Sequence, residues 1–403
     1  MPQLEQKWLP VLGSLLIFLI SSSCTYTLSV EAVTHEFFQS YSTSRRQAVV
    51  DFVTALQMDD GLFVDKLDTY YSERDPVVSS YAVVLLSWLN GLSTITLHNL
   101  LDYCIAYQNL DGGFGLTSND QSTLSATLVI IRLMFACNHI NDVNQADAIN
   151  WVYTLQCEDG GFTNAPPAGT QSGYLWDTTN ALEALVKLGE VSFLNHNDIV
   201  NHIINRQNSD GGFSLSPGED SSNIGTFYAI KALFLLNELE RIDIENVTEY
   251  VKASYDPGLE LIVPLTLAGI HKPYLTLSYL GKLDAVNVDE AADFILSLQS
   301  HLHGAFVSNP EEVDDRREEK IRASHDLIEV LIQLGKEERL NENFEVQETP
   351  VWNELTTPLP PLPPEVVVVF IVVFGLILAF SIGFLLYTKK PKVKKKIKQR
   401  KKR

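Results

Sequence analysis

The segment Gln156-Cys157-Glu158-Asp159-Gly160-Gly161-Phe162 is repeated along the chain, with close copies at residues 108–114 and 207–213. Looser copies surround the glycines at positions 61 and 304, and a decayed copy surrounds position 258. The first glycines of successive copies stand 51, 48, 51, 47 and 46 residues apart, at positions 61, 112, 160, 211, 258 and 304. A near-constant period of this length is typical of proteins built from repeated supersecondary units.

Each unit is predicted to contain two helices joined by the glycine turn. Before the turn, apolar residues recur at helical spacing, as at Ile149, Val152 and Leu155. The glycines suit a helix end that needs a left-handed residue, and the Phe after them suits a position packed between neighbouring units. The second helix of each unit is nearly all apolar, as in residues 229–236, and therefore needs burial on most sides.

Six such pairs can bury their apolar helices by closing into a ring, with the second helices inside and the first helices outside. An open solenoid is the alternative, but it needs polar capping units at both ends, and the sequence shows none. The predicted fold is therefore all-α: an α/α toroid of six helical hairpins over residues 45–337, followed by one C-terminal transmembrane helix.

The predicted membrane anchor lies near the C-terminus. Residues 366–387 form a run of 22 residues without a charge, which is long enough to cross a bilayer as a helix. The last fifteen residues hold eleven Lys or Arg and no Asp or Glu, a bias that favours a cytoplasmic C-terminus. Residues 1–24 have the features of a signal peptide, and retention of this segment as a second anchor is the alternative.

These signals divide the chain into six segments. They are a signal peptide (1–24), a lead-in (25–44), the toroid (45–337), an acidic and Pro-rich stalk (338–365), the transmembrane helix (366–387) and a basic tail (388–403). The predicted location is the cell membrane, with a single pass and the ring outside. Before the last fifteen residues the chain has 50 acidic and 19 basic residues, and so negative a surface excludes nucleic acid as a partner.

The repeated Gln-x-x-Asp-Gly-Gly-Phe element, followed each time by an apolar helix, resembles the α/α-toroid superfamily. This superfamily includes protein prenyltransferase β subunits, squalene and oxidosqualene cyclases, and the thioester domains of complement and macroglobulin proteins. The resemblance covers residues 45–337 and implies a double ring of helices. It is specific for the superfamily and not for one activity within it.

The prenyltransferases of this superfamily bind a zinc ion through an Asp-x-Cys pair at the start of one inner helix and a His at the start of another. The resemblance implies that the corresponding positions of this chain are the ones to examine for zinc ligands. Ser222 and Ile224 fall at the first two positions, and neither is a strong zinc ligand. His325 matches the third position, where it is either a packed helix-start residue or a weak catalytic candidate. We therefore expect no metal and no cofactor. The inner-helix starts are also poor in the Arg and Lys that would bind a diphosphate, apart from a charged loop around residues 311–322.

The terpene cyclases use an Asp-x-Asp-Asp-Thr motif, and the nearest run in this chain, residues 175–179, keeps one of its three acids, Asp177. Asp177 is either a helix N-cap or a second weak catalytic candidate. It belongs to the third unit and His325 to the sixth, on opposite sides of a six-unit ring. Six aromatic residues are expected at the ring mouth, where they either contact a ligand or fill the core: Tyr81, Tyr174, Trp176, Phe227, Tyr228 and Tyr274.

A retained scaffold with eroded catalytic motifs favours a non-catalytic binding module for an apolar or peptide ligand. The expected partners are an isoprenoid, lipid or peptide at the ring mouth, together with the membrane. An enzyme of the terpene-cyclase or prenyltransferase type, acting at the ring mouth, is the alternative, and a purely structural surface protein is a third hypothesis. The predicted location outside the cell argues against the enzyme, because prenyl diphosphates and their protein substrates are cytoplasmic.

Overall fold

The computed structural model describes residues 40–64, 76–117, 119–166, 172–190, 192, 195–254, 267–307 and 317–347. The predicted signal peptide, transmembrane helix and basic tail lie outside these residues, as does the decayed glycine turn at position 258. Within them, no helix combines the length and the apolar composition that crossing a membrane requires.

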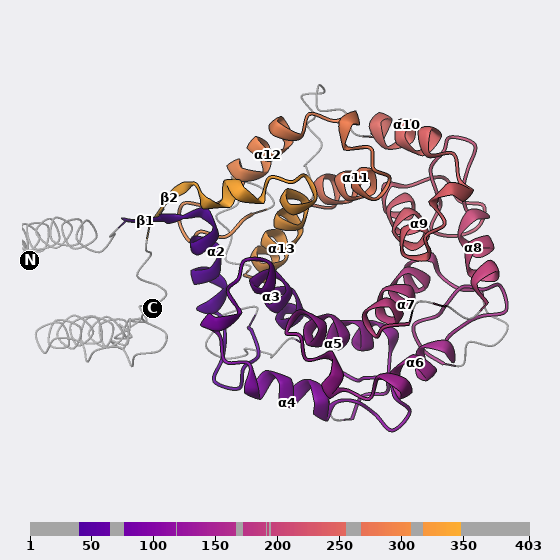
Figure 1. Ribbon diagram of the computed structural model, residues 1–403, viewed down its shortest axis with the longest axis horizontal. Helices are drawn as coiled ribbons and strands as arrows, with labels where there is room; N and C mark the ends of the chain where they lie inside the picture. Colours follow the sequence, from indigo (N-terminus) through magenta and orange to yellow (C-terminus); the bar gives the residue numbers. More distant parts are fainter. Residues whose placement is uncertain are drawn as a thin grey trace, which may run out of the picture. The chain divides into compact units, whose positions relative to one another are not determined.

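The described residues contain twelve α-helices that alternate between an outer and an inner layer (Figure 1). The outer helices are α2 (Arg45–Thr54), α4 (His98–Ala106), α6 (Gln145–Tyr153), α8 (His196–Ile204), α10 (Ile244–Ser254) and α12 (Val288–Ser297). The inner helices are α3 (Pro76–Trp88), α5 (Leu124–Ala136), α7 (Leu175–Lys187), α9 (Asn223–Leu236), α11 (Leu267–Tyr279) and α13 (Arg317–Gln333). Short 3-10 helices are η1 (Leu92–Thr94), η2 (Ile140–Asp142), η3 (Leu239–Arg241), η4 (Leu283–Ala285) and η5 (Glu337–Asn341).

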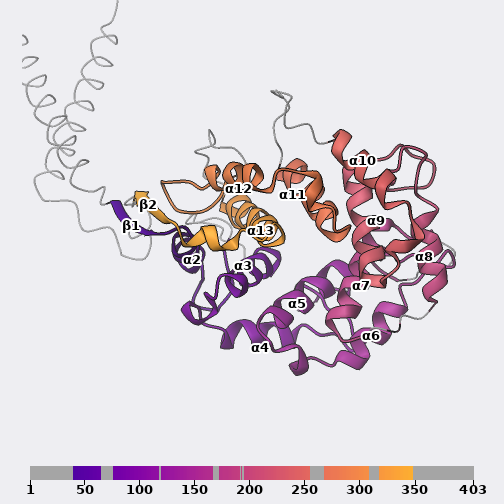
Figure 2. The ribbon, with the colours of Figure 1, turned by 45° about the horizontal axis from the view of Figure 1, so that its top comes forward.

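The inner helices close on themselves. Each packs against the next in chain order, and α13 packs back against α3. Figure 2 shows the same closed ring from an inclined direction. The predicted α/α toroid is therefore confirmed, whereas the number of repeat units stays a prediction because one glycine turn is outside the described residues.

The repeated Gln-to-Phe element joins neighbouring units. Gln108 Nε2 donates to the carbonyl oxygen of Gly112 in its own turn at 3.0 Å and to that of Asn144, which precedes the next outer helix, at 2.9 Å. Gln108 Oε1 accepts the Asn144 N–H at 2.9 Å. Phe114 is fully buried, and its N–H donates to Thr127 Oγ1 on the inner helix. The element is thus a hydrogen-bonded clamp between units, and a buried aromatic ring anchors it.

The same clamp closes the ring. Gln299, at the end of α12, donates to the carbonyl oxygens of Gly304 at 2.8 Å and Arg45 at 2.9 Å. Beside it, β1 (Ser40–Ser44) pairs antiparallel with β2 (Asn343–Gln347), so that Ser40 lies opposite Gln347. The structure therefore places residues 338–347 on the ring, although the sequence had assigned them to the stalk.

Candidate functional site

A cavity of about 310 Å³ is lined by residues from all six inner helices. This volume is at the lower end of the range for small-molecule sites. Because inner helices pack tightly against one another and against the outer layer, the cavity is the space that their inward-facing side chains leave open. We take it as the candidate ligand site.

Aromatic rings form part of the cavity wall. The Trp176 and Tyr228 rings lie 4.8 Å apart, and Tyr228 is 5.1 Å from Phe227. Tyr81 makes an edge contact with the His325 ring at 4.9 Å. Four of the six predicted aromatic residues thus line the cavity.

The other two predicted aromatic residues do not line the cavity. Tyr174 precedes α7 and is 60% exposed, and Tyr274 is buried within α11. A position near the start of an inner helix is therefore not enough to place an aromatic side chain in the cavity. The side chain must also point toward the centre of the ring.

A belt of charged residues crosses the cavity one to two turns deeper. Four inner helices carry a charged residue six positions before the left-handed residue that follows the helix, and all four side chains line the cavity: Arg132, Glu183, Lys231 and Glu329. None of these four residues was predicted from the sequence. A single charge on an otherwise apolar helix, repeated at a fixed distance from the helix end, was the available signal.

Glu183 is the centre of this belt. Its carboxylate accepts two hydrogen bonds from Arg132, at 2.7 and 2.6 Å, and one from Lys231 at 2.7 Å, while Lys187 lies 3.9 Å away. Burial alone would raise the pKa of Glu183, but the charges of Arg132 and Lys231 hold it well below its ordinary value. Glu183 is therefore ionised, and its ion pairs with Arg132 and Lys231 connect α7 to α5 and α9.

The opposite wall carries histidines and carboxylates. His271 Nε2 lies 2.8 Å from Glu329 Oε2, and His325 Nδ1 lies 2.9 Å from Asp326 Oδ1. Lys272 places its Nζ 4.1 Å from the centre of the Phe227 ring. Of the titratable residues on this wall only His325 was predicted from the sequence.

Asp177 is buried in the first turn of α7, and it is not part of the cavity lining. Its prediction as the N-cap is wrong: Tyr174, with an extended backbone, holds that position and makes no side-chain cap hydrogen bond. Asp177 instead accepts the N–H of Asn164, and burial raises its pKa to about 6. Because His325 lines the cavity and Asp177 does not, the structure does not bring the two catalytic candidates together.

The zinc positions implied by the resemblance do not fit a metal. Ser222 caps α9 by accepting the Gly225 N–H at 2.9 Å, and Ile224 is 42% exposed. Neither lines the cavity around His325. Ser222, Ile224 and His325 therefore cannot together bind a zinc ion.

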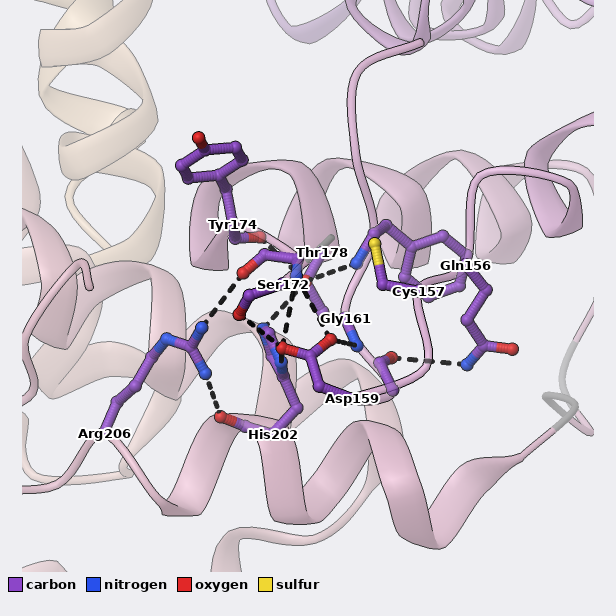
Figure 3. A network of polar contacts seen from close by, with 12 residues as sticks. Gln156, Cys157, Asp159, Gly161, Ser172, Tyr174, Thr178, His202 and Arg206 are labelled. Atoms are coloured by element: carbon purple, nitrogen blue, oxygen red, sulfur yellow. Dashed lines mark hydrogen bonds and ion pairs between the residues drawn. The ribbon is translucent and has the colours of Figure 1, made fainter. Parts of the chain in front are cut away.

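Figure 3 shows a second polar cluster, in which Asp159 and His202 resemble part of a catalytic triad. His202 Nδ1 lies 3.1 Å from Asp159 Oδ2, and His202 Nε2 lies 3.4 Å from Thr178 Oγ1. Both His202 and Thr178 are buried, and His202 packs against Gly161 as Trp151 packs against the equivalent glycine of the preceding unit. Burial and the Arg206 charge lower the pKa of His202 to about 4. The cluster is a packing contact between units, in which the His202 and Thr178 side chains are buried and closed to a substrate.

A closed double ring of helices around a central cavity defines an α/α toroid. The chain matches the family model described as the prenyltransferase alpha-alpha toroid domain over residues 19–134, 117–260 and 273–317. It therefore belongs to the prenyltransferase α/α-toroid family.

Curated relatives include the geranylgeranyl transferase type-2 subunit beta of Saccharomyces cerevisiae, 22% identical over 218 residues, which covers 53% of this chain and 65% of that protein. The same subunit of Candida albicans is 28% identical over 178 residues, 41% of this chain and 51% of that protein. The chain thus spans less than two thirds of the length of these relatives.

Similar solved structures include Candida albicans protein geranylgeranyltransferase-I complexed with GGPP, with a TM-score of 0.56 and 18% identity over 66% of this chain and 85% of that one. The type II terpene cyclase MstE from Scytonema gives a TM-score of 0.52 and 14% identity over 72% of this chain and 97% of that one. At these identities the likeness shows the fold.

Proposed function

We propose that the chain is a membrane-anchored toroid that binds a ligand with an anionic end in its central cavity and does not transfer an isoprenoid. The observation that carries the proposal is the two-part lining of the cavity, with aromatic rings near the inner-helix starts and charged groups deeper. Candida albicans protein geranylgeranyltransferase-I, which has the same fold, was solved in complex with GGPP, an isoprenyl diphosphate. That ligand combines an apolar chain with an anionic end, and we use it as the reference compound.

The charges of the lining favour an anion. The acidic ring keeps an excess of cations inside it, and a low-dielectric cavity strengthens their attraction for an anion. With the histidines left out, five Lys or Arg side chains face three carboxylates there: Arg132, Lys187, Lys231, Lys272 and Arg322 against Glu183, Asp326 and Glu329.

Lys272 is the cation best placed to contact a ligand. Lys231 is held by Glu183 at 2.7 Å and Arg322 lies 3.9 Å from Asp326, whereas Lys272 has no carboxylate within 4.0 Å among the described residues. Its Nζ lies beside the Phe227 and Tyr228 rings. The proposed ligand therefore places its anionic end at Lys272 and its apolar part along these rings.

The charged belt limits how far an apolar chain can enter. Passing an isoprenoid tail across Glu183 and its partners would remove the water that these three part-buried ions still contact and would replace it with nothing polar, which disfavours entry of the tail. We therefore infer that the apolar part of the ligand stays on the side of the helix starts. Absence of the zinc set at Ser222 and Ile224 supports binding without transfer.

The proposal includes the predicted topology, with residues 366–387 as the anchor and the ring outside the cell. Epitope tags placed before residue 45 and after residue 403 test it in intact cells. We expect an antibody to reach only the N-terminal tag until the membrane is permeabilised. Access to both tags, or only to the C-terminal one, would contradict the topology.

Native mass spectrometry of the full-length protein released from nanodiscs tests ligand binding, with geranylgeranyl diphosphate and the neutral geranylgeraniol as probes. We expect one bound diphosphate per chain and at least tenfold weaker binding of the alcohol, because a contact to a charged group contributes about 1.5–3 kcal/mol. Lys272→Met should abolish this preference. Lys252→Met, on the outer helix α10, is the matched control and should not change it.

Three results would overturn the proposal. The first is equal binding of the diphosphate and the alcohol by the native protein, and the second is an unchanged preference in Lys272→Met. The third is conversion of the diphosphate to a new product by the purified protein, which would establish the enzyme alternative.

A further inference from the structure

The chain contains a single Asn-x-Ser/Thr sequence, Asn246-Val247-Thr248, and none of its three residues lines the cavity. Such a sequence accepts an N-linked glycan in chains that cross a membrane into a compartment with the sugar transferase. It lies in the first turns of the outer helix α10 (Figure 1). Use of the site requires an Asn that stays exposed in the folded ring and a chain that is extended when the sugar is transferred.

Asn246 is exposed in the folded ring. Its backbone N–H donates to Asp243 Oδ1 at 3.2 Å, and the residue packs against Gly211 of the preceding turn. Its side-chain amide makes no hydrogen bond to another residue that the structure describes. A sugar bonded to this amide would therefore displace no hydrogen bond of the ring.

The equivalent residues of two other units use their side chains differently. Asn99 and Asp147 also pack against the first glycine of the preceding turn. Asn99 Nδ2 donates to the carbonyl oxygen of Asp59 at 3.0 Å, and Asp147 Oδ2 accepts from Asn144 Nδ2 at 2.6 Å. In these two units the side chain supports the turn or the helix start, whereas the amide of Asn246 has no such structural contact.

Thr248 fixes when a sugar can be added. Its side chain is buried, with 3% exposure, and its hydroxyl donates to the carbonyl oxygen of Ile244 at 2.8 Å. Val247 between the two acceptor residues is fully buried. A transferase that recognises both Asn and Thr cannot contact this hydroxyl once α10 has folded. Transfer must therefore take place while the segment is still extended, as the chain crosses the membrane.

We propose that Asn246 carries an N-linked glycan, which is added before α10 folds and then lies on the outer layer of the ring. The proposal rests on the proposed function in one respect, because it needs the ring to lie outside the cell. In the transfer, the amide nitrogen of Asn246 forms a bond to C1 of the first sugar of a lipid diphosphate-linked oligosaccharide. The C1–O bond breaks, the lipid diphosphate leaves, and the amide proton passes to a base of the transferase.

Translation of the full-length chain in vitro with microsomes tests the site. The chain carries a tag after residue 403. We expect one band of lower electrophoretic mobility that endoglycosidase H reverses. Proteinase K added to the same microsomes should remove the tag and leave the ring intact. Peptide-N-glycosidase treatment converts a modified Asn side chain to a carboxylate, and peptide mass spectrometry should locate this change at position 246.

Matched variants separate this site from any other modification. Asn246→Gln and Thr248→Val should lose the shifted band, and Thr248→Val keeps the shape of the buried side chain. Thr248→Ser should keep the band, because Ser also completes the acceptor sequence. Asn99→Gln changes the equivalent Asn of another unit, which has no Ser or Thr two positions later, and should also keep the band.

A second experiment tests the order of glycosylation and folding. Full-length protein made without a transferase, folded in detergent, is incubated with solubilised microsomal transferase and its oligosaccharide donor. We expect no modification, whereas a peptide of residues 241–253 should be modified under the same conditions. Equal modification of the folded protein and the peptide would overturn the order of events. Near-UV circular dichroism checks that the protein is folded.

Two results would overturn the glycan itself. One is an unshifted native chain whose ring is protected from proteinase K, which would leave the topology intact. The other is a shifted band that persists in Asn246→Gln, which would place the modification elsewhere. Digestion of the ring by proteinase K would instead overturn the topology on which both proposals rest. The glycan and the proposed function can therefore fail separately.

Discussion

Glu183→Gln is the substitution that tests the charged belt most directly. Gln keeps the shape and one acceptor oxygen of Glu183 but removes the negative charge that Arg132 and Lys231 share. The side chains of Arg132, Glu183 and Lys231 are only 29%, 11% and 17% exposed, so water compensates little for the loss. Removing one partner of such a buried group costs about 3–5 kcal/mol, and the partial exposure of Arg132 places our expectation near 3 kcal/mol.

Urea unfolding of the full-length protein, followed by intrinsic fluorescence, measures this free energy. The matched control is Glu249→Gln on α10, where Glu249 pairs with Lys252 at 2.9 Å and is 69% exposed. The control should change the free energy of unfolding by less than about 0.5 kcal/mol, because exposed pairs contribute little. Both variants remove one negative charge, so net charge cannot account for a difference.

A double variant gives a second measurement of the same network. Arg132→Met with Glu183→Leu removes both partners of the closest pair. Lys231 loses its partner in this variant as in Glu183→Gln, but Arg132 remains as an unpaired cation only in Glu183→Gln, so the double variant should destabilise the ring less. A cost below about 1 kcal/mol for Glu183→Gln, or a double variant that is less stable than the single one, would refute the reasoning.

Three further predictions concern the scaffold. Gly112→Ala should cost more than about 4 kcal/mol in urea unfolding, because φ is +96° and a Cβ would meet a backbone oxygen at 2.2 Å, whereas Gly189→Ala, at φ +88° with open space, should cost only about 1–2 kcal/mol; equal costs would contradict the packing argument. Asp177→Asn should stabilise the ring by up to about 3 kcal/mol at pH 8, where the native carboxyl with its pKa of about 6 is ionised at a cost, and the gain should vanish below pH 4; a gain independent of pH would count against burial as the cause. His202→Tyr should remove a loss of stability of up to about 3 kcal/mol that the native protein shows between pH 6.5 and 4, because the unfolded chain takes up a proton that His202, with a pKa of about 4, does not; urea midpoints at pH 4, 5 and 7 check this, and an unchanged slope would refute it.

The ring could be predicted from the sequence because its turns require particular residues. Gly112 has φ +96° and no room for a side chain, and Phe114 is fully buried, so the period of the repeat directly reflects the geometry of the fold. The apolar second helices likewise allow only an inner position. Local requirements that recur at every turn leave a clear periodic signal in the sequence.

The cavity could be predicted only in part. Four of the predicted aromatic residues line it: Tyr81, Trp176, Phe227 and Tyr228. Tyr274 is also aromatic but is buried away from the cavity, because the direction of a side chain depends on how its helix is rotated about its axis. The charged belt was missed because each of its residues is a single exception on an apolar helix. Its partners, such as Arg132 and Glu183, are 51 residues apart and meet only when the ring closes.

The seam at β1 and β2 has a mechanical consequence. Ser40 lies opposite Gln347, so the chain enters and leaves the ring at the same end of a five-residue antiparallel pair. A force that pulls these two ends apart unzips the two strands. It breaks the hydrogen bonds of one residue pair after another and does not load all five pairs together. The ring should therefore begin to open under tension at Ser40 and Gln347, before any of its inner helices separate.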